Sequence, residues 1–138
     1  MAQDLGLDHS ASVTAFANLF GSAISAGGSA TSDAVDLGSV SGGMLGLELK
    51  LVAGSGTVDG PFVVRLLWSL DNTDFTDGAR GEVVWAYTPT ASATAIMIRS
   101  VPIRARYVKM RVENQGSSGP QITTSSACSY QQIYGNQA

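Results

Sequence analysis

The feature that most constrains the fold is a strict alternation of leucine with other residues near the middle of the chain. In the segment Met44–Val52 every second residue is a leucine, and Glu48 and Lys50 stand between them. Side chains of a β-strand point alternately to opposite faces, whereas a helix would scatter these leucines around its axis. The segment therefore predicts a half-buried strand with four leucines on its inner face.

Further strands are predicted where the chain is extended and apolar in the same way. Residues 107–113 alternate apolar with polar and charged side chains. Residues 62–70 are apolar at most positions, which is typical of a strand that is central in its sheet or covered on its outer face. The other expected strands are residues 82–87 and 94–101, followed by the weaker candidates 31–37, 121–134 and 12–20.

These segments define the expected fold. About eight short strands at spacings of about ten to fifteen residues, with turn residues between them and no long helix, predict an all-β protein. We expect an antiparallel β-sandwich or jelly roll of about eight strands. The 138 residues suit one domain. We expect residues 12–138 to form it and residues 1–11 to form an N-terminal arm, in which Leu5 and Leu7 contact a neighbouring subunit.

The composition predicts a folded domain with a lightly charged surface. Hydrophobic residues make up 44% of the chain and charged residues only 14%, the opposite of the balance in disordered chains. Surfaces of this kind tend to be covered by partners. The first residues lack the basic and apolar regions of a signal peptide, and no apolar run approaches the roughly 20 residues of a membrane helix. We therefore expect no membrane partner.

The charges are unevenly distributed along a chain of net charge −3. Five acidic residues and no basic one precede Lys50, whereas the stretch 99–111 holds five basic residues and no acidic one. Two interpretations remain open: a solvated strand face balanced by carboxylates elsewhere, or a docking surface that fixes register in an assembly. The acidic total disfavours nucleic acid as a partner. The candidate assembly contacts in this stretch are Arg99, Arg104, Arg106, Lys109 and Arg111.

The residues that usually carry catalysis are scarce. His9 is the only histidine and Cys128 the only cysteine, so neither a Ser-His-Asp nor a Cys-His arrangement can be assembled within one chain. A single cysteine also excludes an internal disulfide, and we expect Cys128 to be a small buried apolar residue. The sequence therefore predicts a protein that is not an enzyme, with no catalytic residue and no cofactor.

The sequence contains residues typical of two further kinds of site, a calcium site and a glycan-binding site. Residues 71–78 contain three Asp and one Asn, which are calcium ligands, but the spacing is not that of an EF-hand. Asp and Asn also bond their own backbone in turns, so a turn is favoured and no metal site is predicted. Trp85 and Tyr87 are candidate glycan contacts, because sugar-binding sandwiches display aromatic rings on a face or rim. Trp68 alternates with leucines and is expected in the core.

Two motifs resemble known proteins. The stretch VVRLLWSLDNTDF, which ends at Phe75, and the stretch ARYVKMRV at residues 105–112 resemble the pattern of discoidin-like jelly-roll domains. The chain also resembles the small β-sandwich virion proteins of tailed bacteriophages, which share a Gly/Ala/Ser-rich lead-in like that at residues 22–40. Secreted discoidin domains usually carry a disulfide and long ligand-binding loops. This chain has one cysteine and short expected loops, which favours the virion resemblance.

The resemblance implies a non-enzymatic phage structural protein, in the first place a capsid decoration (cement) protein that binds the head lattice. Its expected partners are the major capsid protein or other virion proteins, and it would act as a homo-oligomer, often a trimer. It would be found in the virion after synthesis in the host cytoplasm. The alternative is a carbohydrate-binding module or a tail, neck or fibre component with the same fold.

Overall fold

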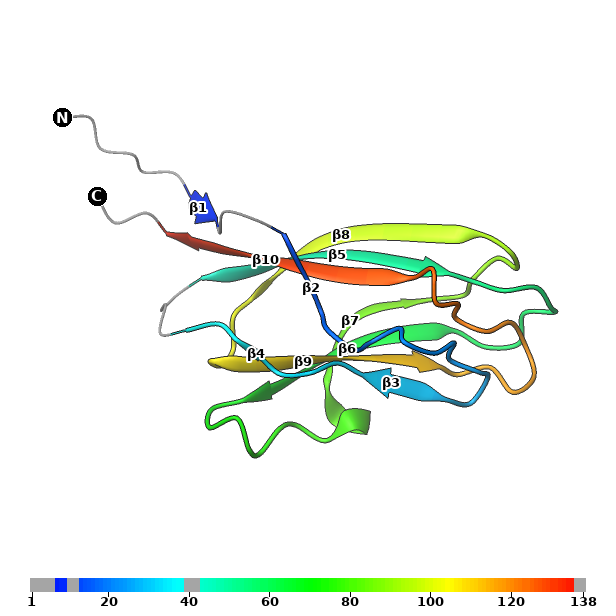
Figure 1. The fold of residues 1–138 in the computed structure, drawn as a ribbon, viewed down its shortest axis with the longest axis horizontal. Coiled ribbons are helices and arrows are strands. Elements are labelled where there is room, and N and C mark those ends of the chain that lie inside the picture. The colour runs from blue at the N-terminus through cyan, green and yellow to red at the C-terminus, as the bar shows by residue number, and fades with distance from the viewer. Residues whose placement is uncertain (1–6, 10–12, 39–42, 136–138) are drawn as a thin grey trace.

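The chain folds into two antiparallel five-stranded sheets that pack face to face (Figure 1). The structure is a computed structural model that describes residues 7–9, 13–38 and 43–135. It confirms the predicted all-β sandwich. The elements in the described residues are β1 (Leu7–His9), β2 (Thr14–Ala15), β3 (Ser29–Thr31), β4 (Val35–Asp36), β5 (Met44–Val52), β6 (Phe62–Ser69), the 3-10 helix η1 (Gly78–Arg80), β7 (Glu82–Tyr87), β8 (Thr94–Pro102), β9 (Tyr107–Asn114) and β10 (Ala127–Gly135).

Each sheet has two long inner strands, β10 and β5 in one and β9 and β6 in the other. In the first, the order is β1-β10-β5-β8, and β2 also pairs with β10. In the second, the order is β3-β9-β6-β7, and β4 also pairs with β9. We call them the β5 sheet and the β6 sheet. Figure 1 shows the β5 sheet as the upper layer and the β6 sheet as the lower one.

The five strongest predicted strands are present, whereas the three weaker ones are shortened or divided. The segment 31–37 divides at Ser32, whose hydroxyl accepts the Met110 N–H at 2.9 Å in place of a backbone carbonyl. The segment 12–20 keeps only Thr14–Ala15, because the chain turns at Asn18, which has a positive φ of 60°. The segment 121–134 becomes regular only from Ala127.

The core lies between the sheets and confirms the leucine alternation. The four leucines of β5 are fully buried and belong to the same cluster as the inner residues of β6 and β9. Full burial of a leucine side chain contributes roughly 1.5–3 kcal/mol, so this strand alone supplies a large share of the stabilisation. The inner residues of the three strands are Leu45, Leu47, Leu49, Leu51, Phe62, Val64, Leu66, Val108, Met110 and Val112.

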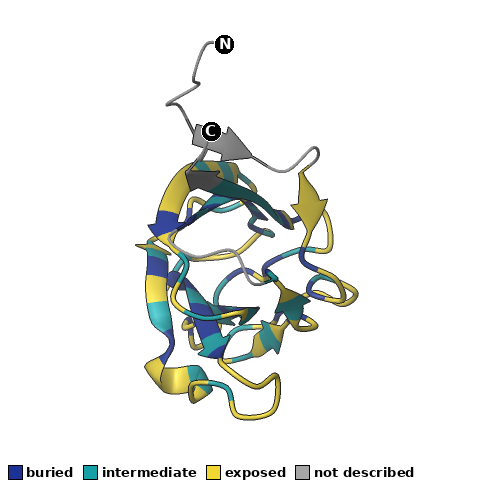
Figure 2. Ribbon diagram, turned by 90° about the vertical axis from the view of Figure 1, so that its left-hand side faces the viewer, coloured by how far each residue is buried: buried dark blue, intermediate teal, exposed yellow. Residues whose placement is uncertain are grey.

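The outer face of the β6 sheet is covered as well. Val63 and Leu67 point away from the core and are nevertheless buried. The connection between β6 and β7 folds back over Leu67: a Cβ added at Gly81 would lie 2.5 Å from Leu67 Cδ2, so only glycine fits there. Figure 2 shows this connection beneath the lower layer. The prediction that residues 62–70 form a central strand, apolar on both faces, is confirmed.

A carboxylate joins two loops at one end of the sandwich. Asp59, in the β5–β6 loop, accepts hydrogen bonds from the N–H and hydroxyl groups of Ser117 and Ser118 in the β9–β10 loop, at 2.7–3.1 Å. The Ser117 hydroxyl, followed by the Ser118 N–H, holds the pKa of Asp59 at about 2. The loops approach closely at Gly116 and Gly119, where an added Cβ would lie 2.6 Å from Asp59 Oδ1.

We expect Asp59→Asn to destabilise the protein near neutral pH, because an amide cannot accept the four hydrogen bonds as well as a carboxylate. A depressed pKa stabilises the fold above the unfolded-state value of about 3.8, and this share is lost as the pH falls towards about 2. The gap in urea midpoint between wild type and variant should therefore close over that range. Asp77→Asn, which removes a carboxylate that makes no capping hydrogen bond, is the control. A gap that stays constant with pH would contradict the clamp.

Candidate docking surface

The predicted basic stretch does not form one surface. Arg99 lies on the inner side of β8, where its guanidinium donates to the Val84 carbonyl oxygen of the other sheet at 3.0 Å. Arg104 and Arg106 follow in the β8–β9 connection, and Lys109 and Arg111 lie on the outer face of the β6 sheet. The five cations thus face three different parts of the molecule.

Four of these cations have carboxylate or ring partners within the chain. Arg104 pairs with Glu82 at 2.9 Å, Arg106 binds Asp36 through two hydrogen bonds, and Arg111 Nε lies 3.6 Å from Glu113. The Lys109 ammonium lies 4.3 Å from the centre of the Phe75 ring. These contacts agree with the interpretation of a charged face balanced by carboxylates elsewhere. Docking through the five cations stays a prediction.

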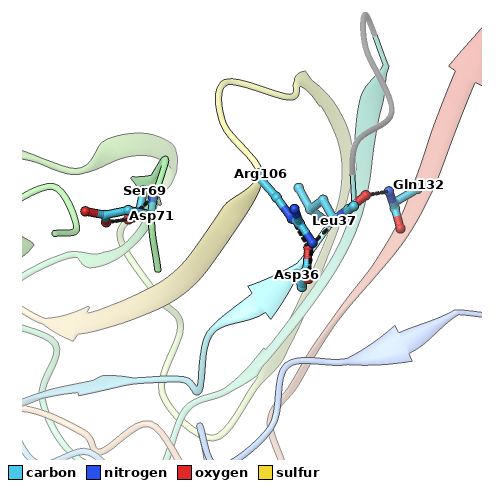
Figure 3. Close-up of polar contacts among 7 residues, drawn as sticks. Asp36, Leu37, Ser69, Asp71, Arg106 and Gln132 are labelled. Carbon is cyan, nitrogen blue, oxygen red and sulfur yellow. Dashed lines mark hydrogen bonds and ion pairs between the residues drawn. The ribbon is translucent and has the colours of Figure 1, made fainter. Parts of the chain in front are cut away.

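The Arg106–Asp36 pair belongs to a brace between the two sheets (Figure 3). The hydrogen bonds from Arg106 lower the pKa of Asp36 and raise that of Arg106 itself. At the next residue, Gln132 of β10 donates to the Leu37 carbonyl oxygen at 2.7 Å. Leu37 donates in turn to the Arg106 carbonyl oxygen at 2.7 Å. Strand β10 of the β5 sheet is thereby joined to the residue that follows β4 of the β6 sheet.

The candidate glycan residues face the core margin. Trp85 and Tyr87 are half-buried and stack on each other, with ring centres 4.2 Å apart and planes inclined by 13°. Each ring therefore covers one face of the other. Burial raises the pKa of Tyr87 to about 12. Trp68 is also half-buried at the margin of the core, where its indole N–H donates to Glu82 at 3.0 Å. Glycan binding by Trp85 and Tyr87 stays a prediction.

The acidic loop forms a turn of the kind that its residues favour. Asp71 Oδ1 accepts hydrogen bonds from the backbone N–H groups of Thr73 and Asp74 at 2.9 Å and from the Ser69 hydroxyl at 3.0 Å (Figure 3). These bonds lower the pKa of Asp71, the backbone ones most. Among the residues that the structure describes, no three His, Cys, Asp or Glu side chains gather closely enough to hold a metal ion.

The predicted arm lies partly outside the described residues. Leu5 is outside them, and Leu7 begins β1, which pairs with the end of β10: Leu7 lies opposite Gly135 and His9 opposite Ile133. Residues 7–9 therefore extend the β5 sheet of their own chain. In the part of the chain that the structure describes, no helix has the length and apolar character needed to cross a membrane.

The outer face of the β5 sheet holds three of the five large hydrophobic residues that are exposed in the described molecule. The strand register places the even residues of β5 and β8 and the odd residues of β10 on it. Ile96 and Ile98 are 64% and 77% exposed, and Val13 beside β10 is 58% exposed. We call this surface the bare face. Its members are Val13, Ala15, Met44, Gly46, Glu48, Lys50, Val52, Thr94, Ile96, Ile98, Ser100, Pro102, Ala127, Ser129, Gln131 and Ile133.

The bare face carries little charge and is slightly hollow. Glu48 and Lys50 are its only charged members. A hollow of about 160 Å³ lies over Gly46, between Val13 and Ile98. A Cβ at Gly46 would come within 3.2 Å of Ile133 Cδ1, so a larger residue would push that side chain aside. The two outer faces of the sandwich are therefore unlike: one is covered and charged, the other exposed, apolar and nearly uncharged.

Comparison with known proteins supports the fold. No protein-family model and no curated protein matches the sequence. The solved structure of the PBSX exported protein XepA is similar at 17% identity and a TM-score of 0.51, over 93% of this chain and 38% of that one. A chain in the structure of infectious bursal disease virus, Gx strain, is similar at 12% identity and a TM-score of 0.56, over 94% and 32%. This chain thus spans about a third of their length.

A third solved structure, a family GH115 4-O-methyl-α-glucuronidase named BtGH115A, covers 98% of this chain and 18% of its own at 13% identity. Its TM-score of 0.46 is too low to support any conclusion. At the identities of the other two structures, the likeness shows the fold alone. A shared fold does not establish a shared function, which depends on the surfaces of this chain.

We expect Cys128 to be unreactive in the folded protein. Its side chain is buried, and this burial raises the pKa of its thiol to about 12. The thiolate, which is the reactive form, is then nearly absent at mildly alkaline pH, and the reagent has no access to it. Mass spectrometry after iodoacetamide treatment should show modification in urea and almost none in buffer. Labelling of the folded protein at the rate of an exposed cysteine would contradict this placement.

Proposed function

We propose that the protein is a non-enzymatic structural protein of a tailed-phage particle, which decorates the head by seating its bare face on the major capsid protein. The observation that carries this proposal is the contrast between the two outer faces. The β6–β7 connection covers Leu67 on the β6 sheet, whereas Ile96, Ile98 and Val13 stay in water on the β5 sheet. Contiguous exposed apolar surface on a soluble protein commonly marks an interaction site.

The physical basis of the docking is burial of a preformed surface. Burying an exposed isoleucine or valine contributes roughly 1.5–3 kcal/mol, and about 800 Å² per partner is enough for a stable interface. The strands of the bare face are already fixed by their hydrogen bonds, so little conformational entropy is lost on binding. With only Glu48 and Lys50 on this surface, few charges have to be desolvated. Repeated copies on a lattice then add avidity.

The phage part of the proposal is supported by the resemblance to small virion proteins, with the Gly/Ala/Ser-rich lead-in at residues 22–40, and the fold occurs in a chain of a virus structure. The non-enzymatic part is supported by the groups that could act in catalysis. Cys128 is buried, and the carboxylates of Asp59 and Asp71 accept hydrogen bonds from nearby backbone and hydroxyl groups. Decoration of the head, instead of a place in the tail, neck or fibre, is the finer step of the proposal.

A pair of valine substitutions tests the docking face. We expect Val13→Lys to weaken binding to particles that lack the protein by about tenfold or more, because a lysine ammonium would have to be desolvated in the interface. Val83→Lys introduces the same change at an exposed site on the outer side of the β6 sheet and should bind as the wild type does. Both sites are exposed, so both variants should fold. Cosedimentation with the particles measures the binding.

The place in the virion is tested by the copy number of the protein in purified particles. Decoration of the head requires a number comparable with that of the major capsid protein, because each lattice position offers an equivalent site. A number set by a single ring would assign the protein to the neck or tail. Absence from the particles, or equal loss of binding in both valine variants, would overturn the proposal.

A further inference from the structure

Strand β8 is an edge strand whose free side can be assigned from its hydrogen bonds. The Ala53 N–H donates to the Ala93 carbonyl oxygen and the Ile103 N–H to the Gly43 carbonyl oxygen. Odd-numbered positions along β8 therefore bond to β5, since backbone groups alternate sides along a strand. The even-numbered residues of β8 direct their N–H and C=O groups away from the sheet, and β8 ends the strand order.

The outward side chains of this edge read almost the same in both directions. From the start of β8 the even-numbered residues are Thr94, Ile96, Ile98 and Ser100. A hydroxyl residue stands at each end and two isoleucines stand at the centre, symmetrically about Met97. Pro102, the next even residue, has no N–H and so limits the pairing edge to these four residues.

We propose that the β8 strands of two copies of this chain pair antiparallel across a two-fold axis at Met97, joining the two β5 sheets into one continuous sheet. In this register Ile96 lies opposite Ile98 of the second copy, and Thr94 lies opposite Ser100. The four residues of each strand whose backbone N–H and C=O groups point outwards form four hydrogen-bonded pairs with the second copy. Each pair exchanges two hydrogen bonds, so the two strands share about eight. Directly opposed β-branched side chains stabilise such pairs.

The residues on the inner side of β8 fit the same register. Arg99, whose guanidinium reaches across to the Val84 carbonyl oxygen, comes to lie opposite the small Ala95 of the second copy. A shift that centred the axis on Arg99 would oppose two guanidinium groups, and cross-strand like charges are destabilising. The symmetric register at Met97 therefore satisfies both faces of the strand.

The charges beside β8 also suit a second copy. Lys50 neighbours Ile96 and Glu48 neighbours Ile98 in the β5–β8 register. A row of outward side chains that crosses the axis then contains Lys50 and Ile96 of one copy, followed by Ile98 and Glu48 of the second copy. Opposite charges end each row, and the four isoleucines form one apolar cluster between them. A strand of another protein would need a matching pattern of apolar and hydroxyl side chains to pair equally well, and β8 of a second copy has this pattern.

The long edge strand of the other sheet, β7, is protected, unlike β8. In β7 a bulge interrupts the register opposite Val64 and Arg65, and the Arg99 side chain occupies the Val84 carbonyl oxygen. Bulges and charged side chains directed at an edge are the usual means by which proteins block strand addition. The even-numbered side of β8 has neither before Pro102.

Self-association of the isolated full-length protein tests the pairing, independently of any particle. Sedimentation velocity over a range of concentrations should show a monomer–dimer equilibrium. Ile98→Lys should weaken it about tenfold or more, because each lysine would lie opposite Ile96 of the second copy and the apolar cluster would be broken. Leu70→Lys is the control, since Leu70 is an exposed apolar residue at the end of β6 and away from β8. A monomer at all concentrations, or equal weakening by both substitutions, would overturn the pairing.

Disulfide trapping tests the register. In a pair of strands centred on Met97, the two copies of this residue form a non-hydrogen-bonded pair with Cα atoms about 4.5 Å apart, within disulfide range. Met97→Cys should therefore give a covalent dimer under mild oxidation, with Cys128 buried and unreactive. Ser100→Cys, in the same strand, should not, since the two copies of residue 100 would lie far apart. Faster cross-linking of Ser100→Cys than of Met97→Cys would overturn the proposed register.

Discussion

The apolar layer between the two sheets determines where every other side chain of the sandwich points. Leu47 and Leu49 are buried because alternate residues of β5 face the β6 sheet. The register with β5 then determines which residues of its neighbouring strands face inwards. Met97 lies opposite Leu49 and shares its inner face, so Ile96 and Ile98 have to face outwards. A slip of one residue in β8 would bury both isoleucines but expose the inner residues. The exposed apolar face is thus a direct consequence of the register that builds the core.

The sequence was a good guide wherever a strand carries its own periodic signal. The bounds of β5 and β7 were predicted to the residue, and β6, β8 and β9 to within one residue, because their alternation reflects burial on one or both faces. The short strands β2, β3 and β4 carry no such signal. They are strands because β9 and β10 offer them partners, and their breaks depend on single residues such as Ser32, whose hydroxyl replaces a backbone acceptor. Tertiary context of this kind is invisible in a local pattern.

The candidate site was harder to predict because its position depends on pairing between distant segments. The basic stretch is prominent in the sequence, yet Arg106 pairs with Asp36, 70 residues away, and Arg104 with Glu82, 22 residues away. Spacing along the chain gives no indication of these partners. The sequence predicted a strand that contains Ile96 and Ile98, but residues 94–101 include apolar side chains on both faces of that strand. Only the register with β5 shows which side meets water, and hence that the apolar surface lies on the β5 sheet.

The exposed face and the unprotected edge are best understood together. In an isolated monomer, exposure of Ile96 and Ile98 to water is unfavourable. The unpaired edge beside them is also a liability, since such edges promote uncontrolled association. The β6 sheet shows that this chain can reduce both costs: a loop covers Leu67 on its outer face, and a bulge and Arg99 protect the β7 edge. Among the described residues, no loop covers Ile96 and Ile98 and no bulge interrupts the pairing of β8 with β5. Pairing of β8 would satisfy the edge and bring four isoleucines together on a continuous sheet, which doubles the apolar surface available for docking. The proposed assembly, in which the β5 sheet is covered and the β6 sheet faces the solvent, would account for this asymmetry of the sandwich.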